Sequence, residues 1–214
     1  MVAIRITSVD APLDRPGLGQ AAARLVRRAS GVGLLAGTRT PERLDLELVR
    51  DIARSALAEG VGQDAALAIL RVKEAGSGVA AADELGDLLA RLDDALASSP
   101  MPGRELGELL RTYDPDTLAA MLGVSIASLR RYARRTRRVP DDVAERIHYL
   151  ALVSSDLAGS YNEFGMRRWW QRPRSLLGGR SPRGALIGAW DPDGPDARAV
   201  ADMARGLTGG GAAT

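Results

Sequence analysis

The apolar residues of this chain recur with the period of an α-helix along most of its length. The clearest case is a stripe of leucines at i, i+3, i+4, i+7 and i+11, with charged residues between them: Leu85, Leu88, Leu89, Leu92 and Leu96. An α-helix turns by about 100° per residue, so this spacing places all five side chains on one face. The stripe predicts a helix whose apolar face either packs into a core or dimerises.

A second helix is predicted in residues 40–60, where Thr40 offers an N-cap, Pro41 stands at the first helical position and Gly60 provides a stop. The same periodicity predicts further helices at about residues 21–29, 63–76, 102–112, 116–122, 125–135, 141–159, 162–170 and 196–206. One isolated strand fits residues 3–9. We therefore predict a mainly α fold.

The helical pattern is interrupted at residues 98–103, SSPMPG, where two prolines and a glycine occur together. The charge balance changes at the same place: residues 1–98 carry 12 basic and 14 acidic side chains, whereas residues 99–180 carry 14 basic and 9 acidic. Since the net charge of the whole chain is only +2, its basic character is local, as expected of a binding face. We predict a domain boundary here, with a helical N-terminal domain of unknown role at residues 1–98.

Residues 116–135 carry the pattern of a helix-turn-helix. Two short helices that cross nearly at right angles need a small residue at the crossing and a glycine in the turn, which Ala119 and Gly123 supply. Apolar residues occupy the positions that must be buried: Leu118, Leu122, Val124, Leu129 and Tyr132. Ser125 follows the turn, where the second helix needs an N-cap. We therefore predict a helix-turn-helix domain at residues 99–160.

Six arginines and no acid occupy the nine positions from Arg130 to Arg138. On the second helix Leu129, Tyr132 and Ala133 fall in one arc, and the arginines fall on the opposite side. Arginine pairs bidentately with guanine edges and also contacts phosphates, so the pattern favours a double-stranded DNA operator as partner. We expect Ile126, Ala127, Ser128, Arg130 and Arg131 near the bases, and Arg134, Arg135, Arg137 and Arg138 near the phosphates. The alternative is that the run is only a solvated helix end.

The segment after the helix at 141–159 contains two adjacent tryptophans, a proline and the run LLGGRSP at residues 176–182. Together with the helix-turn-helix and a short last helix, this order resembles the Xre/MbcA/ParS antitoxin family over about residues 105–207. The matching positions are Trp170, Pro173, Leu176, Leu177, Gly178, Gly179, Pro182 and Leu186. In that family an Asp-Thr pair usually follows the leucine, where this chain has IGAW at residues 187–190.

The resemblance implies that residues 161–214 form a small α-helical toxin-binding domain, with those eight positions as candidates for toxin contact. It also implies a cognate toxin, commonly a RES-domain enzyme that degrades NAD, and repression of the chain's own operon. From the residues alone, one of Trp169 and Trp170 is expected in the core and the other at an interface. The alternative is a stand-alone transcriptional regulator whose C-terminal domain mediates oligomerisation. Either protein is expected to bind DNA as a homodimer or higher oligomer. The leucine stripe and the 141–159 helix are the two candidate dimer surfaces.

Other chemistry has little material in this chain. It contains no cysteine and one histidine, His148, which excludes disulfides, thiolate zinc sites and catalytic sites that need two histidines. The glycine-rich residues 31–39 lack a phosphate-binding lysine, and the acidic run at 191–196 reads as a plain turn rather than a calcium loop. No uncharged stretch approaches the roughly 20 residues of a membrane span. We expect a cytoplasmic protein that is not an enzyme and uses no metal or cofactor.

Overall fold

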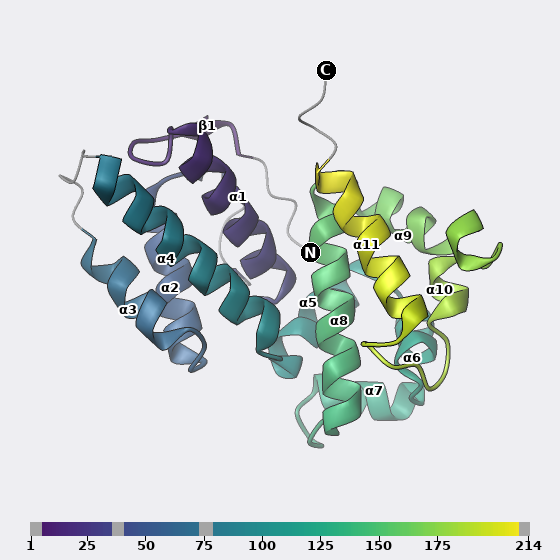
Figure 1. The fold of residues 1–214 in the computed structure, drawn as a ribbon. Coiled ribbons are helices and arrows are strands. Elements are labelled where there is room, and N and C mark those ends of the chain that lie inside the picture. Colours follow the sequence, from purple (N-terminus) through teal and green to yellow (C-terminus); the bar gives the residue numbers. More distant parts are fainter. Residues whose placement is uncertain (1–5, 36–40, 73–78, 210–214) are drawn as a thin grey trace. The chain divides into compact units, whose positions relative to one another are not determined.

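The computed structural model describes residues 6–35, 41–72 and 79–209. Over these residues the fold is mainly α, which confirms the predicted fold class (Figure 1). The chain divides into two compact units on either side of the bond between Ser99 and Pro100. We call them the N-terminal unit and the C-terminal unit.

In its described residues the N-terminal unit has four helices and one pair of very short strands. Its elements are β1 (Ser8–Val9), α1 (Pro16–Gly31), β2 (Arg43–Leu44), α2 (Leu46–Ala58), α3 (Gln63–Arg71) and α4 (Val79–Ser98). The two strands pair in parallel, with Ser8 opposite Arg43. Helix α4 packs against α1 and α3, and α3 packs against α2. The predicted strand at 3–9 is thus only two residues long within the described part of the chain.

The leucine stripe belongs to α4 and lies inside the N-terminal unit. All five leucines are at least 93% buried there, since their exposed fractions run from 0% to 7%. The sequence allowed this apolar face to be either part of a core or a dimer contact, and the structure shows that it is part of a core. This excludes the stripe as the dimer surface, because its apolar area is already covered by α1 and α3.

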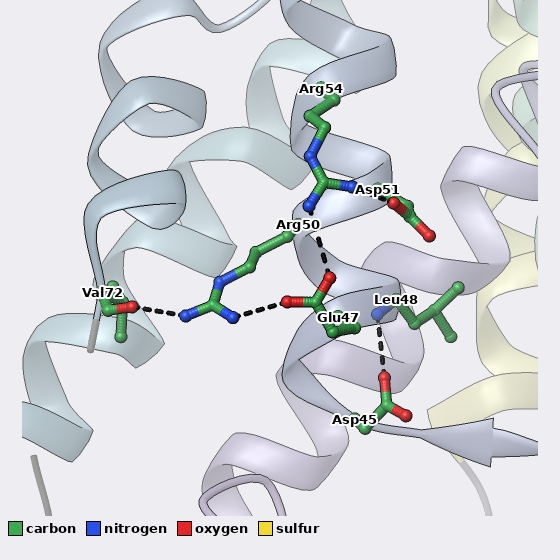
Figure 2. Close-up of polar contacts among 7 residues, drawn as sticks. All are labelled: Asp45, Glu47, Leu48, Arg50, Asp51, Arg54 and Val72. Carbon is green, nitrogen blue, oxygen red and sulfur yellow. Dashed lines mark hydrogen bonds and ion pairs between the residues drawn. The ribbon is translucent and has the colours of Figure 1, made fainter. Parts of the chain in front are cut away.

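Helix α2 begins later than predicted, because Asp45 and not Thr40 is its N-cap. The Asp45 carboxylate accepts the backbone N–H of Leu48 at 2.8 Å, while Thr40 lies outside the described residues (Figure 2). The stop at Gly60 is confirmed: its φ of +75° is a left-handed conformation that glycine adopts freely. Helix α3 ends at Arg71, before the predicted end at Gly76, which also lies outside the described residues.

Arginines and carboxylates of α2 pair with one another. Arg50 donates to Glu47 at 2.6 Å and to the carbonyl oxygen of Val72 at 2.6 Å, so it ties the end of α3 to α2 (Figure 2). Arg54 donates to Asp51 and, at 3.3 Å, to Glu47. The hydrogen bonds from Arg50 and Arg54 lower the pKa of the Glu47 carboxyl. The charged side chains of α2 thus pair with one another and with the end of α3.

The regular structure of the C-terminal unit is helical throughout residues 100–209. Its elements are α5 (Pro102–Thr112), α6 (Pro115–Leu122), α7 (Ile126–Ala133), α8 (Asp141–Ala158), α9 (Glu163–Gln171), the 3-10 helix η1 (Ser175–Leu177), α10 (Pro182–Ala185) and α11 (Pro195–Gly209). Helix α8 packs against α5 and α11 (Figure 1). Because most apolar side chains of α8 are buried, this helix has little apolar surface left for contact with a second copy. This argues against the 141–159 helix as a dimer surface.

The sequence predicted a boundary at residue 160 within this unit, but one hydrophobic core extends from Leu106 to Ala204. The indole N–H of Trp170 donates to the Tyr113 hydroxyl at 2.9 Å, and that hydroxyl is hydrogen-bonded to Ser154 at 2.8 Å. Burial raises the pKa of Tyr113. Residues 99–160 and 161–214 therefore do not have separate cores, because each side supplies buried side chains that the other needs.

Candidate nucleic-acid interface

Helices α6 and α7 are joined by the short turn that the sequence predicted, and each has its own N-cap. The Asp114 carboxylate accepts the Thr117 N–H at 2.8 Å, a hydrogen bond that lowers the pKa of Asp114. Ser125 accepts the Ser128 N–H at 3.1 Å, which confirms the predicted cap of α7. Gly123 has φ +68°, the left-handed conformation that lets the chain leave α6 abruptly. Local sequence signals thus define both helices.

The burial pattern across the two helices agrees with a helix-turn-helix. Val124 is partly buried against the core, and the other predicted positions are buried: Leu118, Ala119, Leu122, Leu129 and Tyr132. Ala133 differs from the prediction, since it is exposed. It is the last residue of α7 and lies beyond the edge of the core, so its angular position no longer ensures burial.

Arg130 and Arg131 are exposed on α7, away from the buried Leu129 and Tyr132. Arg131 makes one weak local contact, from its guanidinium to the Ser128 hydroxyl at 3.4 Å. Among the described residues, neither arginine forms an ion pair, and α7 itself contains no acid. Their charge remains available to a ligand outside the chain.

The other residues expected near the bases differ in accessibility. Ala127 is exposed, but the Ile126 side chain packs partly against the core. Ser128 is half-buried and belongs to the hydrogen-bonded cap with Ser125, whose hydroxyl donates to it at 3.1 Å. The structure therefore brings Ala127, Arg130 and Arg131 together at one exposed face and leaves Ile126 and Ser128 at its margin.

The four arginines assigned to phosphates follow the helix and do not lie on it. Helix α7 ends at Ala133, with Arg134 as its C-cap and Arg135 at φ +56°, so the predicted helix end at residue 135 is wrong. All four are exposed. The Arg137 guanidinium lies over the Tyr132 ring at 5.8 Å, and that of Arg138 is 3.3 Å from the Asp141 carboxylate in a pair almost wholly open to solvent.

Arg135 differs from its neighbours in lying beside α5. A side chain on Gly103 would place its Cβ 3.6 Å from Nε of Arg135, so the guanidinium lies along the first turn of α5. The backbone N–H of Arg135 donates to the Tyr132 carbonyl at 3.0 Å, which continues the turn that ends α7. Arginines 130 to 138 thus make a short helical face followed by a bent, exposed segment.

The eight positions that resemble the antitoxin family fall into two classes. Four are buried, and three of these belong to the hydrophobic core: Trp170, Leu177 and Leu186 belong to it, and Pro182 is buried in α10. Four are exposed: Pro173, Leu176, Gly178 and Gly179. The buried four cannot contact a partner without unfolding, so they hold the segment in shape. The expectation that one of Trp169 and Trp170 lies at an interface is also wrong, because both indoles are buried and pack edge to face.

The four exposed positions lie in or next to one compact turn at residues 174–180. The Gly179 N–H donates to the Arg174 carbonyl at 3.0 Å, and the Arg174 N–H donates to the Arg180 carbonyl at the same distance. Gly178 and Gly179 have φ +63° and +83°, conformations that favour glycine. The turn presents Leu176, whose side chain is 76% exposed.

Arg180 anchors this turn to α11. Its guanidinium makes two hydrogen bonds of 2.8 Å to the Asp196 carboxylate, which lower the pKa of Asp196 and raise that of Arg180. Asp196 lies in the first turn of α11, so this bidentate pair joins the turn to the start of that helix. An apolar side chain on a rigid turn is suited to protein contact.

Two residues near the helix-turn-helix were missed by sequence reasoning, Trp190 and Arg146. Trp190 donates its indole N–H to the Met121 carbonyl at 2.6 Å, and Arg146 donates to the Leu122 carbonyl at 3.2 Å. The rarity of aromatic residues, 4% of the chain, was a signal that could have singled out Trp190. Its partner in α6 could not have been read from the sequence, because the two residues are far apart along the chain.

His148 has a structural partner. Its Nδ1 lies 2.5 Å from the Glu105 carboxylate, which is fully buried, and the pair links α5 to α8 inside the core. Within the described parts of the chain, no group of three or more residues has the composition of a metal site. The same residues include no helix with the length and apolar character needed to cross a membrane.

Comparisons with protein-family models, with curated proteins and with solved structures gave no match for this chain.

Proposed function

We propose that the chain is a DNA-binding antitoxin that represses its own operon and neutralises a toxin by direct binding. The observation that carries the DNA-binding part is the exposed face of α7, where Arg130 and Arg131 project from a capped helix without an acidic partner in the described chain. Arg134, Arg137 and Arg138 extend the positive charge beyond the helix end. Base-reading arginines followed by phosphate-binding ones are typical of a helix-turn-helix on a major groove.

The experiment that tests DNA binding is selection of duplexes from a random library by the full chain. We expect a consensus duplex to emerge and to bind more tightly than a scrambled duplex of the same length and composition. The preference should persist at about 0.15 M salt, where non-specific binding is weak. Recovery of no consensus would contradict the proposal, because a merely solvated arginine run has no base preference.

The toxin-binding part of the proposal depends on the resemblance and on the exposed turn at 174–180. The turn is anchored by Arg180 and Asp196 and offers Leu176 to a partner. We propose a RES-type NAD-degrading enzyme as that partner, which is what the resemblance implies. We also propose that the protein is cytoplasmic, because an operator-binding protein acts where the DNA is. We further propose that it is not an enzyme and uses no metal or cofactor.

Neutralisation is tested by co-expression with the product of the neighbouring gene, the toxin candidate. Leu176→Asp should abolish growth rescue and co-purification, because it places a charge at the centre of the contact. Phe164→Asp is the matched control: Phe164 is 61% exposed but lies in α9 and not in the turn. Rescue by Leu176→Asp at the wild-type level would remove the turn from the toxin contact.

The alternative function is a stand-alone regulator that uses its C-terminal unit to oligomerise. Exposed apolar residues in α9 and near the end of α11, Phe164 and Leu207, favour it. A single helix-turn-helix buries little surface, so we propose a homodimer or higher oligomer in either case. Under the alternative, Phe164→Asp lowers the oligomeric state in light scattering and no neighbouring toxin co-purifies. A monomer that still binds one operator tightly would contradict both forms of the proposal.

A further inference from the structure

The segment Leu186 to Trp190, which we call the strap, lies over the C-terminal end of α6. The last carbonyls of any α-helix have no partner within the helix and need donors from elsewhere. Here the carbonyls of Ala120, Met121 and Leu122 each receive one from outside α6 and its turn. The donors are the Gly188 N–H at 3.5 Å, the Trp190 indole N–H at 2.6 Å and the Arg146 guanidinium at 3.2 Å.

Two of these donors are fixed by further contacts. Arg146 also donates from Nε to the Trp190 carbonyl at 3.0 Å, and its guanidinium lies 6.0 Å from the centre of the Trp190 ring. The indole packs edge to face against Tyr149 at 5.0 Å, and the Tyr149 hydroxyl donates to the Ala197 carbonyl at 2.6 Å. Trp190 is 9% exposed. The strap is thus held between α6, α8 and the start of α11.

The strap also fits closely against the turn between α6 and α7. A Cβ at Gly123 would lie 2.8 Å from the Gly188 carbonyl oxygen, closer than a side chain can approach a backbone atom. The turn therefore has no room to move toward the strap. Helices of eight residues are marginal in isolation, so the direction in which α7 projects depends on such tertiary contacts.

We infer that the strap is a positioning element of the DNA-reading helix, with Trp190 and Arg146 as its positioning residues. By holding the end of α6 and the turn, they determine where Arg130 and Arg131 lie relative to the groove. Base contacts need this placement more than phosphate contacts do, because bidentate hydrogen bonds tolerate less displacement than charge attraction. The inference rests on the proposed DNA binding and adds the residues that orient it.

The test uses Trp190→Phe in the full chain, since phenylalanine retains an aromatic ring but cannot donate to Met121. Trp169→Phe is the matched control, because Trp169 is also buried but packs against Trp170 and Arg174. At a temperature where circular dichroism shows both variants folded, Trp190→Phe should bind the selected consensus duplex about tenfold more weakly, because displacement of α7 weakens the bidentate base contacts of its arginines. Its affinity for the scrambled duplex should change less than about twofold. Equal losses on both duplexes, or none, would overturn the inference.

A second pair of variants covers the case in which Trp190→Phe does not fold. Gly123→Ala and Gly178→Ala introduce the same strain at φ +68° and +63°, but only the Cβ at Gly123 meets the strap, while Gly178 has open space around it. Only Gly123→Ala should lose preference for the consensus duplex. Equal preference in the two variants would overturn the inference.

Hydrogen exchange separates failure of this inference from failure of the proposed function. If the wild-type chain selects no duplex, DNA binding fails, and the strap is judged by exchange alone. Gly123→Ala should then raise amide exchange in α6 and α7 more than in α9, whereas Gly178→Ala should not. Unchanged protection of α6 and α7 would mean that the strap does not position them.

Discussion

Arginines of the N-terminal unit and those of the segment Arg130–Arg138 are used in different ways. In the N-terminal unit Arg28 donates to Asp93 at 2.7 Å, and Arg50 and Arg54 share Glu47 on one face of α2 (Figure 2). In the C-terminal unit the segment from Arg130 to Arg138 contains one ion pair among the described residues, between Arg138 and Asp141, and it is almost wholly solvated. The same side chain stabilises a fold in one region and remains available in the other.

This difference shows that the number of arginines does not identify a binding face. An exposed ion pair stabilises a protein little, but it neutralises a charge that could otherwise attract phosphate. A run of arginines without acids keeps its field, as the segment after Leu129 does. Availability of charge, together with the capped helix that presents it, distinguishes the proposed interface from the rest of a chain whose net charge is only +2.

The largest effect is expected where an arginine depends on its carboxylate inside the fold. Asp93→Ala leaves the largely buried Arg28 without its partner, and breaking a buried pair in this way costs about 3 kcal/mol. Urea denaturation should show this loss in the unfolding of the N-terminal unit. Asp94→Ala, at an exposed neighbouring position of α4, is the control and should change stability by less than about 0.5 kcal/mol. Similar stability of the two variants would mean that Asp93 and Arg28 do not depend on each other.

The next effect concerns the exposed arginines of α7. Arg130→Ala or Arg131→Ala should weaken binding to the consensus duplex by about 1–3 kcal/mol and relax base preference at the contacted position. Arg54→Ala removes an equally charged but internally paired arginine of α2, and it should leave DNA affinity unchanged. Fluorescence anisotropy on consensus and scrambled duplexes measures both. If the α7 variants lost affinity equally for the two duplexes, these arginines would not read bases.

Arg137 tests the phosphate-binding part of the same segment. Arg137→Ala should weaken binding to all duplexes alike and reduce the slope of log K against log salt by about one, because one fewer counterion is released. A salt titration from low to moderate ionic strength gives that slope. Arg91→Ala, an exposed arginine of α4, provides the control. A loss confined to the consensus duplex would move Arg137 from the phosphates to the bases.

The smallest effect is expected at Arg180 and Asp196, a solvent-exposed pair outside the interface. The lowered pKa of Asp196 means that its stabilising contribution is present above the ordinary carboxyl pKa, about 3.9, and is lost as pH falls through the lower folded value. Asp196→Asn should therefore lower Tm slightly at pH 7, and the difference from wild type should shrink in acid.

The partner variant Arg180→Gln checks that this small difference comes from the pair. The double variant should lose no more stability than either single variant, because removing one partner already abolishes the interaction. Additive losses, or a difference that grows in acid, would show that the two hydrogen bonds do not carry it.

Removal of the chain after Ala158 is not a useful way to separate toxin binding from DNA binding. Such a truncation would be informative only if residues 161–214 formed a separate domain, as the sequence pattern predicted. The structure shows that the truncation would remove Trp169, Trp170 and Trp190 from the core that holds α6 and α7. Substitutions at exposed positions test the two activities without that loss.

The sequence by itself determined the elements of the interface whose signals act over a few residues. Helical periodicity, the cap at Ser125 and the glycine at 123 locate α6, the turn and α7, since each depends on hydrogen bonds to neighbours within about four positions. The cluster of arginines was visible for the same reason. The start of α2 was misplaced because two polar residues, Thr40 and Asp45, could each have capped it, and the local pattern does not choose between them.

Only the tertiary structure decided which of these residues are free and what holds them in place. Burial of Trp170 and exposure of Leu176 could not be assigned from residue type, because both depend on which other segments pack nearby. The hydrogen bond from Trp190 to Met121 joins residues 69 positions apart, and no periodic signal spans that distance. Such residues are brought together by the packing of the core of the C-terminal unit as a whole. The contact between the strap and the helix-turn-helix could therefore be found only from the tertiary structure.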